Sequence, residues 1–435
     1  MTAADSPDVA IVGGGPAGST AAALLAEAGR HVVLIEKGAH PRFHVGESLL
    51  PRNMDILERL GVMEAVREIG VYKPGAAFIS DRTGRTSSFS FAQTMNRART
   101  HAWQVRRSEF DALLFANAAR LGAKTLESTR VTDIRFGAPG ERATVAVRDA
   151  MGAVRDIRPR YVIDASGRET FLAGRMRLKA SNKVNNTACL YAHFRGVEKQ
   201  EGVLDGYISI HFAEDGWFWL IPLPDDVMSI GFVGNQAAWK GRQGSAEDLF
   251  LARLAGSPTV AARTRNAVRV SEVISTGNYS YRAQRGHGDG YLMIGDAFGF
   301  VDPMFSTGVL IAMLGGEFAA AAADAWLDDP ARGTRMAART NREMARAMDR
   351  ISWLIYRIND PVMRSLFMEP RNTLWMRDGL VDLLAGNLRS NLRTFLPVLL
   401  FKALFHTLSA LHRAGMGPVM PEALPAPAEG QTVTP

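Results

Sequence analysis

Three glycines near the N-terminus have the spacing that allows a polypeptide to wrap around a pyrophosphate. They are Gly13, Gly15 and Gly18, and they directly follow the apolar run Val9 to Val12. The first glycine permits a tight turn, the second lets the backbone approach the phosphates, and the third lets a helix pack closely on a strand. A helix that begins here directs its free amides toward the phosphates.

Glu36 lies at the end of a second apolar run, His31 to Ile35, 18 positions after Gly18. An acidic side chain at the end of this second strand accepts hydrogen bonds from a ribose. The small-residue stretch Thr20 to Ala28 predicts the helix between the two strands. We therefore favour a dinucleotide site over a turn without a ligand. The chain has no second glycine fingerprint of this kind, so nothing indicates a separate nicotinamide domain.

Two aspartates follow later apolar runs. Asp164 begins Asp-Ala-Ser-Gly-Arg, and Asp296 lies in Gly-Asp-Ala after Tyr291 to Ile294. With the glycine turn, these motifs resemble the para-hydroxybenzoate-hydroxylase-like FAD monooxygenase superfamily. The resemblance implies FAD, with Asp296 at its ribityl or pyrophosphate part and Arg107, in Val-x-Arg-x-x-Phe-Asp, at the flavin. A surface arginine at a helix start remains the alternative for Arg107. The expected FAD-binding residues are Gly13, Gly15, Ala17, Gly18, Glu36, Lys37, Arg107, Asp296 and Gly308.

Trp217 and Trp219 belong to the segment Trp-Phe-Trp-Leu-Ile-Pro that ends at Pro222. Alternate residues of a strand share a face, so the two indoles are expected on one side. The pattern W-x-W-x-I-P resembles the signature of flavin-dependent halogenases. That resemblance implies that the indoles form a barrier between the flavin and a substrate chamber. A packing pair in the core of a sheet is the alternative.

Lys73 lies downstream of Gly-Glu-Ser-Leu-Leu-Pro, the segment Gly46 to Pro51. The halogenases place their essential lysine in this region, so the resemblance implies a catalytic role for Lys73. An ammonium can orient hypohalous acid, and a neutral amine can form a haloamine. A solvated surface lysine is the alternative. Glu47 is a candidate polar neighbour of this route, or equally a structural carboxylate in a turn.

The segment Ser306 to Gly308 precedes an apolar helix pattern, and backbone amides at a helix N-terminus suit an anion. In halogenases the halide lies here, so Thr307 and Gly308 are the candidate halide ligands. Amides that face only the flavin ring are the alternative. The tryptophan-halogenating branch has a glutamate where this chain has Phe305. The resemblance is therefore closer to the branch that halogenates phenols or pyrroles, often tethered to a carrier protein.

The resemblance implies a reaction sequence. A partner flavin reductase supplies reduced FAD, which reacts with O2 to form a flavin hydroperoxide, and chloride or bromide attacks it to form hypohalous acid. This passes the tryptophans to Lys73 and halogenates an electron-rich aromatic ring. The alternatives are an aromatic hydroxylase that uses no halide and a reductase similar to geranylgeranyl reductase. A flavin-binding or membrane-associated protein that docks through its basic C-terminal helices also remains open; the residues concerned are Arg389, Arg393, Lys402 and Arg413.

The predicted fold is α/β: a Rossmann-type FAD-binding fold interleaved with an antiparallel substrate sheet, followed by a helical C-terminal region. We expect the FAD-binding domain over residues 1–328, with the sheet at about 185–280. Helices are expected over 329–416 and a disordered tail rich in proline and alanine over 417–435.

The composition is that of a soluble globular protein, with 47% hydrophobic and 22% charged residues. The net charge is +7, but no dense Lys/Arg run with interleaved aromatics occurs, so we expect no nucleic-acid partner. The single cysteine, Cys189, excludes an internal disulfide and a multi-cysteine metal site. The acidic start Met1 to Pro7 predicts a cytoplasmic protein without a signal peptide. Lys402 and His406 interrupt the apolar stretch Phe395 to Leu411, so no transmembrane segment is expected, although a helix lying on a surface is not excluded.

Overall fold

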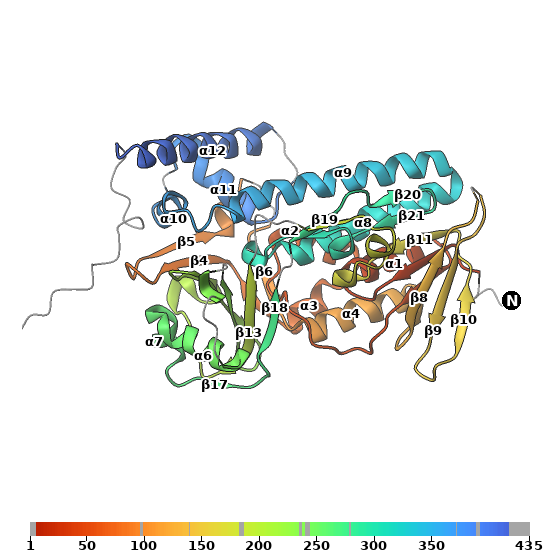
Figure 1. The fold of residues 1–435 in the computed structure, drawn as a ribbon, viewed down its shortest axis with the longest axis horizontal. Coiled ribbons are helices and arrows are strands. Elements are labelled where there is room, and N and C mark those ends of the chain that lie inside the picture. The colour runs from red at the N-terminus through yellow and green to blue at the C-terminus, as the bar shows by residue number, and fades with distance from the viewer. Residues whose placement is uncertain are drawn as a thin grey trace, which may run out of the picture.

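A parallel sheet forms one half of the protein (Figure 1). The computed structural model describes residues 6–95, 99–138, 140–181, 187–234, 237–239, 244–277, 280–370, 372–388 and 392–416. The sheet has the order β20-β21-β11-β1-β2-β7, and all of its neighbours are parallel except the pair β20 and β21. Its strands are β1 (Val9–Val12), β2 (Val32–Ile35), β7 (Lys124–Leu126), β11 (Tyr161–Asp164), β20 (His287–Gly288) and β21 (Tyr291–Met293).

Helix α1 (Pro16–Glu27) and helix α8 (Thr307–Asp328) pack against each other beside this sheet. A Cβ on Gly316 of α8 would lie 2.5 Å from the carbonyl oxygen of Ala17, so only a glycine allows this approach. The other helices of the first two hundred residues are α2 (Pro51–Arg59), α3 (Met63–Glu68), α4 (Arg107–Arg120) and α5 (Phe171–Arg175). The close α1–α8 contact holds the start of α8 near the glycine turn.

The second large sheet has eight strands in the order β17-β13-β16-β15-β14-β4-β5, with β18 also paired to β13. Strands β13 to β16 pair antiparallel, as expected, but β14 pairs with β4 in parallel. The strands are β4 (Gly75–Ser80), β5 (Thr86–Ser90), β13 (Ala188–Arg195), β14 (Ile208–Phe212), β15 (Gly216–Leu223), β16 (Val227–Gly234), β17 (Val268–Arg269) and β18 (Ile274–Gly277). Helices α6 (Ala246–Gly256) and α7 (Pro258–Thr264) connect β16 to β17.

Three smaller strand groups complete the β structure. A three-stranded sheet at one end of the molecule consists of β8 (Arg130–Arg135), β9 (Thr144–Arg148) and β10 (Val154–Ile157). Strand β3 (Gly70–Lys73) pairs with β6 (Ala102–Val105). The third group consists of β12 (Lys179–Ser181), β19 (Tyr281–Ala283) and β22 (Gly299–Phe300).

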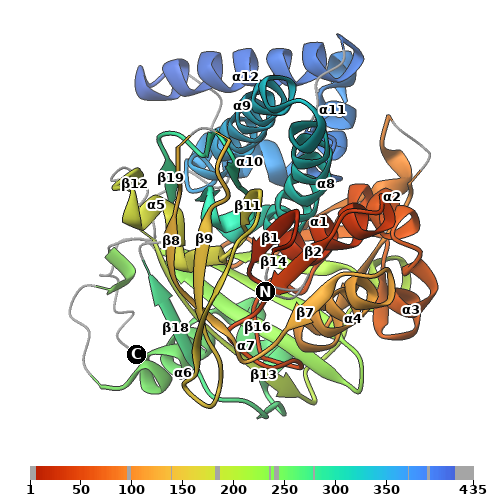
Figure 2. The ribbon, with the colours of Figure 1, turned by 90° about the vertical axis from the view of Figure 1, so that its right-hand side faces the viewer.

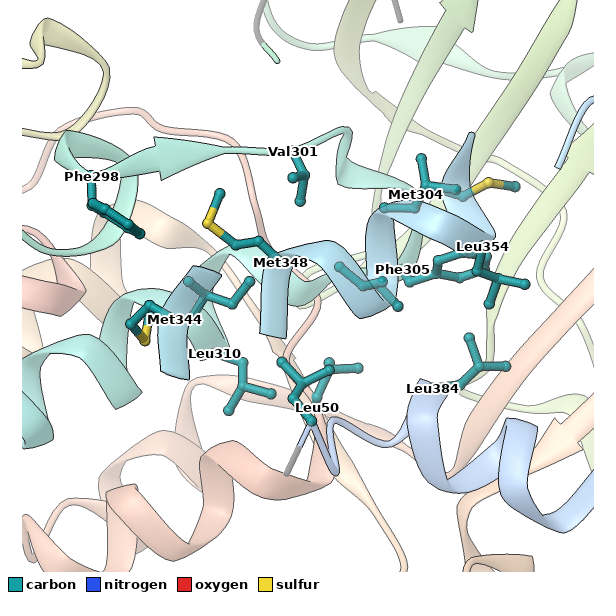
Figure 3. Packing of buried hydrophobic residues seen from close by; sticks show 14 of the residues in the cluster. Leu50, Phe298, Val301, Met304, Phe305, Leu310, Met344, Met348, Leu354 and Leu384 are labelled. Carbon is teal, nitrogen blue, oxygen red and sulfur yellow. The ribbon is translucent and has the colours of Figure 1, made fainter. Parts of the chain in front are cut away.

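The C-terminal part is helical and lies along one side of both large sheets (Figures 1 and 2). It consists of α9 (Pro330–Ile355), α10 (Pro361–Met368), α11 (Met376–Leu384) and α12 (Leu392–Arg413). Figure 3 shows how it joins the rest: Met344 and Met348 of α9 lie with Leu310 of α8, and Leu384 of α11 lies near Leu50. The helices therefore share a hydrophobic core with the half that contains the parallel sheet.

Two helices in the described part of the chain are long and apolar enough to cross a membrane, judged by length and composition alone. In α8 the apolar window is 61% buried, so it is a core helix of the protein. In the C-terminal helix the window Phe395–Arg413 is only 17% buried. The two polar interruptions at Lys402 and His406 thus do not bring this stretch below the hydropathy of a span, contrary to the expectation from the sequence.

The α/β fold with an interleaved sheet and a helical C-terminal region is confirmed. The substrate sheet, however, is wider than the segment 185–280, because β4 and β5 come from residues 75–90. The expected boundary near 328 coincides with the break between α8 and α9 at Asp329. The start of the expected sheet at Asn185, Arg389, the side chain of Arg393 and the tail 417–435 lie outside the described residues.

Candidate active site

One cavity of about 600 Å³ runs from the glycine turn to the face of the large antiparallel sheet. One end is lined by residues of β1, α1 and β2, including Gly13, Ala17 and Glu36. The other end is lined by Trp217 and Trp219 of β15. Gly15, Lys37, Arg107, Asp296 and Gly308 line it between or beside these ends. The fold thus gathers eight of the nine expected FAD-binding residues, and both tryptophans, around one space.

The glycine turn owes its shape to close backbone contacts. Gly13 has a φ of +104°, and a Cβ there would lie 2.3 Å from the carbonyl oxygen of Ala165. A Cβ on Gly18 would lie 1.9 Å from the carbonyl oxygen of Gly13, so Gly18 packs the helix on the strand and does not line the cavity. A Cβ on Gly15 would meet only Arg42, at 3.8 Å. Gly15 therefore leaves the backbone open to a bound group.

Glu36 stands at the end of β2, where two backbone amides hold its carboxylate. Oε2 accepts from the amide of Gly14 at 2.8 Å, and Oε1 accepts from the amide of Gly38 at 2.9 Å. Oε2 also accepts from Nη2 of Arg42 at 3.4 Å, while Oε1 can accept a further hydrogen bond, so a ribose can still bind. Next to it, Lys37 forms an ion pair with Glu169 at the cavity edge.

Arg107 is the first residue of α4, and its guanidinium is buried at the middle of the cavity. Nε and Nη2 donate to Asp111 at 2.7 and 2.9 Å, and Nη1 donates to the carbonyl oxygen of Val45 at 2.7 Å. Burial alone would lower the pKa of Arg107, but the Asp111 carboxylate outweighs it and raises that pKa. Arg107 is therefore a fixed positive charge.

Asp296 lies in the turn after β21 and faces the same space. Loss of solvation raises the pKa of Asp296 to about 6, although Arg107 and Arg168 act in the opposite direction. Asp164 has a different role, because its carboxylate accepts from the amides of Ser166 and Leu172 at 2.9 and 2.8 Å. It closes the turn of its own motif and is not among the cavity-lining residues.

These features fit FAD. The cavity offers a glycine-rich turn at a helix N-terminus, an acidic side chain for a ribose, and a buried arginine at its centre. Gly15 and Gly46 leave backbone exposed where a side chain would fill space, since a Cβ on Gly46 would lie 3.0 Å from Nη1 of Arg107. The chain's own groups would thus hold the pyrophosphate, the adenosine ribose and the flavin.

Trp217 and Trp219 lie on the same face of β15, as their spacing predicted, with ring centroids 5.9 Å apart. The indole of Trp219 lies over Gly231 of the neighbouring strand, where a Cβ would be 2.1 Å from the ring. Its Nε1 donates to Oγ of Ser229 at 3.2 Å. The neighbouring strand therefore holds this indole in place and makes it a rigid wall.

The N-terminus of α8 lies at the cavity between Ser306 and Gly308, both of which line it. Ser306 has a left-handed backbone with a φ of +57°. Thr307 is 1% exposed, and its Oγ1 has no hydrogen-bond partner within the described chain. A buried hydroxyl without a partner is costly unless something binds there. The start of α8 is thus suited to an anion, although Thr307 itself is not among the residues that line the cavity.

Lys73 is the last residue of β3 and is 1% exposed. Its Nζ donates to the carbonyl oxygen of Leu49 at 2.8 Å and lies 5.2 Å from the centre of the Phe91 ring. Burial lowers the pKa of Lys73 to about 7. This lysine is not solvated, but it does not line the cavity, because it lies behind the segment whose residues Glu47 and Ser48 do.

Two side chains join at the cavity from distant parts of the sequence. Glu47 is 2% exposed, and its Oε1 lies 2.8 Å from Nε2 of His193 on β13. Three residues were missed from the sequence: Arg42 and Tyr191 line the cavity, and His193 packs against Phe43, which also lines it. For Arg42 a signal did exist, since it lies in the loop directly before the Gly-Glu-Ser motif.

Phe305 is buried and points away from the cavity. Its ring stacks with Phe367 of α10 at a centroid distance of 6.0 Å, while its neighbours Met304 and Ser306 line the cavity. Phe367 in turn contacts Phe78 and Phe89 of the large sheet. The position that distinguishes the halogenase branches therefore lies within an aromatic cluster between the sheet and the C-terminal helices.

Known proteins are similar to this chain in sequence and fold. A family model described as an FAD binding domain matches residues 6–315. A 1H-pyrrole-2-carbonyl peptidyl-carrier protein chlorinase of Pseudomonas fluorescens is 31% identical over 330 residues, which cover 70% of this chain and 73% of the relative. The chain belongs to the flavin-dependent halogenases. This halogenase is an FAD-dependent oxidoreductase, as the motifs predicted.

The halogenase is also 33% identical to the flavin-dependent halogenase armH3 of Armillaria mellea, over 72% of its own length and 66% of that relative. It thus spans slightly less than two thirds of the fungal protein. A solved flavoprotein/dehydrogenase from Cytophaga hutchinsonii has the same fold, with a TM-score of 0.85 and 28% identity over 94% of this chain and 99% of the other.

Proposed function

We propose that this protein oxidises chloride or bromide to hypohalous acid and uses it to halogenate an electron-rich phenolic or pyrrolic ring. One observation carries the proposal. The cavity that fits FAD ends at the two tryptophans, while Lys73 lies buried behind the Glu47 segment with a pKa lowered to about 7. Halogenation requires one site that forms the oxidant at the flavin and a second site that directs the oxidant to the substrate. The flavin cavity and the separate buried lysine match these two sites.

In this proposal the halide binds at the N-terminus of α8. Helix N-termini attract anions, and α8 is 22 residues long. The cavity-lining backbone at Ser306 and Gly308 supports a halide there, and Oγ1 of the adjacent, buried Thr307 has no hydrogen-bond partner among the described residues. Arg107 adds a permanent positive charge to the same cavity.

Reduced FAD, when bound, supplies the chemistry that activates O2 and oxidises the halide. The protein contributes confinement and orientation. Trp217 and Trp219 wall the flavin end of the cavity, which prevents a bulky substrate from reaching it directly. Lys73 receives the small oxidant: its ammonium donates a hydrogen bond to hypohalous acid, and its neutral form, populated because of the lowered pKa, can hold the halogen.

The substrate class follows from Phe305. A phenylalanine at this position supplies no carboxylate for an indole N–H, and its ring packs away from the cavity against Phe367. The relative from Pseudomonas fluorescens acts on a pyrrole bound to a carrier protein. We infer a phenol or pyrrole substrate, either free or carrier-bound.

The proposal includes a separate flavin reductase as partner, because the sequence has no second dinucleotide fingerprint. It places the enzyme in the cytoplasm, where the reductase and its nicotinamide are available. Both remain predictions from the sequence.

The test is to incubate the purified protein with FAD, a flavin reductase, NADH and either bromide or chloride. Phenolic and pyrrolic substrates are offered free and loaded on a carrier protein, and products are detected by their halogen isotope pattern. Lys73→Ala should abolish halogenated product and leave FAD binding intact, whereas Lys124→Ala, on an exposed position of β7, should change neither. Halogenation by Lys73→Ala at the normal rate would contradict the role of Lys73.

A flavin reductase or dehydrogenase is the second candidate, because Lys73 does not line the cavity and the Cytophaga hutchinsonii neighbour is a flavoprotein/dehydrogenase. Aromatic hydroxylation without halide is a further alternative from the sequence. The same incubation separates them: hydroxylation adds oxygen regardless of halide, and a reductase consumes reduced flavin without O2.

A further inference from the structure

The outward face of α12 is apolar. The helix packs on the protein through Phe401, Phe405 and Ser409, which are buried and four residues apart. On the exposed side, Phe395, Leu396 and Leu399 are 50%, 55% and 48% exposed. A helix on the surface of a soluble protein normally presents charged side chains to water. Helix α12 contains no aspartate or glutamate at all.

Further apolar side chains are exposed next to α12. Leu374 and Trp375, in the short helix η8 (Thr373–Trp375), are 57% and 64% exposed, and η8 contacts α12. We call the five residues together the C-terminal apolar patch: Leu374, Trp375, Phe395, Leu396 and Leu399. Contiguous exposed apolar surface of this kind marks a site of protein or membrane interaction.

The C-terminal region that carries this patch is strongly positive. Residues 330–416 contain 14 lysine and arginine residues against 6 carboxylates, a net charge of +8, whereas the whole chain carries +7. Five arginines recur every three or four residues along the exposed side of α9, which places them in one stripe. They are Arg332, Arg335, Arg339, Arg342 and Arg346.

The end of this stripe meets α12 at Trp353. Nζ of Lys402 lies 4.7 Å and the guanidinium of Arg357 lies 4.9 Å from the Trp353 ring. Burial lowers the pKa of Lys402, and the neighbouring Arg357 and Arg350 lower it further. Like charges are therefore crowded at the α9–α12 contact, and an anion bound there would relieve their repulsion.

We propose that α12 docks on the surface of an anionic lipid membrane, with the C-terminal apolar patch inserted among the acyl chains and the α9 arginines at the lipid phosphates. Interfacial helices combine an apolar face with lysine and arginine in this way, and anionic lipid attracts each basic residue near the surface. Figures 1 and 2 show α12 along the outside of the molecule, on the side away from α6 and α7, where a flat surface can reach it.

A lipid surface fits better than an acidic carrier protein. The carrier would satisfy the arginines, but exposed leucine and phenylalanine along a helix without any carboxylate favour hydrocarbon over a charged partner. The docking does not depend on the proposed halogenation, because none of these residues lines the cavity.

The test is co-sedimentation of the full chain, loaded with FAD, with vesicles of phosphatidylcholine alone or with one-third phosphatidylglycerol. We expect binding to the anionic vesicles, at least about tenfold weaker binding to the neutral ones, and weakening by salt. The variant Phe395→Ser/Leu396→Ser/Leu399→Ser should lose binding. The variant Arg339→Gln/Arg342→Gln/Arg346→Gln should bind roughly a hundredfold more weakly.

A control variant replaces apolar residues elsewhere that are more exposed than those of the patch. Met151 and Val203 are 92% and 89% exposed, and Met151→Ser/Val203→Ser should bind vesicles like the unmodified protein. Circular dichroism and FAD titration verify that each variant is folded. Absence of binding to anionic vesicles would overturn the proposal. If vesicles do not bind, a concentration-dependent dimer that the triple serine variant abolishes would show that the patch contacts a second copy of the chain. Capture of an acidic carrier protein would show that it contacts that protein. Either result would overturn membrane docking.

Discussion

Replacing Lys73 with methionine should stabilise the protein in neutral and acidic solution while it abolishes halogenation. Lys73 is 1% exposed, and burial lowers its pKa from 10.5 to about 7. Methionine has a similar length and no charge to bury. The prediction separates the free-energy cost of burying the Lys73 ammonium from the role of Lys73 in catalysis.

The magnitude follows from the shift in pKa. A base with a lowered pKa in the folded state destabilises that state, fully below the folded pKa, and the cost disappears as the pH rises toward 10.5. The shift of about 3.5 units corresponds to about 5 kcal/mol at low pH. Methionine leaves the carbonyl of Leu49 without its donor, which costs about 1–3 kcal/mol at every pH. The net gain is therefore about 3 kcal/mol below neutrality.

The assay is urea unfolding of the apoprotein and the Lys73→Met variant at about pH 6.5 and about pH 9.5. The gain in unfolding free energy of the variant over the unmodified protein should be about 3 kcal/mol larger at the lower pH, since most of the cost of desolvating the charged lysine applies only there. The hydrogen-bond loss cancels in this difference. Lys124→Met, on the exposed β7, is the control and should show no such pH dependence. An equal effect of Lys73→Met at both pH values would refute the buried, pKa-shifted lysine.

Gly18→Ala should weaken FAD binding at least about tenfold, because its Cβ would lie 1.9 Å from the carbonyl oxygen of Gly13. Flavin fluorescence titration measures the affinity for FAD. Gly174→Ala is the control, because a Cβ on Gly174 would meet no atom within 4 Å. Gly231→Ala should cost about 1–3 kcal/mol in urea unfolding by displacing Trp219, and unchanged tryptophan emission would contradict it. Thr307→Val should raise the KM for halide about tenfold without loss of stability, since it removes a hydroxyl without a partner; an unchanged KM would remove Thr307 from the halide site.

The part of the fold that local patterns determine was predictable. The apolar run, glycine turn, helix and acidic residue lie within residues 9–36, and each follows from steric and capping rules that act over short distances. The positions of Trp217 and Trp219 on one face needed only the period of a strand. Asp296 and Arg107 were found through motifs, and the fold places both at the cavity.

Other features depend on contacts between distant segments. The width of the large sheet was not predictable, because β4 joins β14 through hydrogen bonds that no local pattern specifies. Glu47 meets His193 across 146 positions of sequence. Asp164 was found through its motif, but the motif did not reveal that the Asp164 carboxylate accepts hydrogen bonds within its own turn and does not line the cavity.

The dinucleotide turn and the shared face of the two tryptophans therefore followed from residue type and spacing, whereas FAD, halogenation and the role of Lys73 were indicated by the resemblance to known families. Only the tertiary structure decided that Lys73 is desolvated, that the Thr307 hydroxyl has no hydrogen-bond partner in the described part of the chain, and that α12 exposes an apolar face. The reason is physical: burial and pKa are set by everything packed around a group, and most of that packing comes from residues far away in the chain.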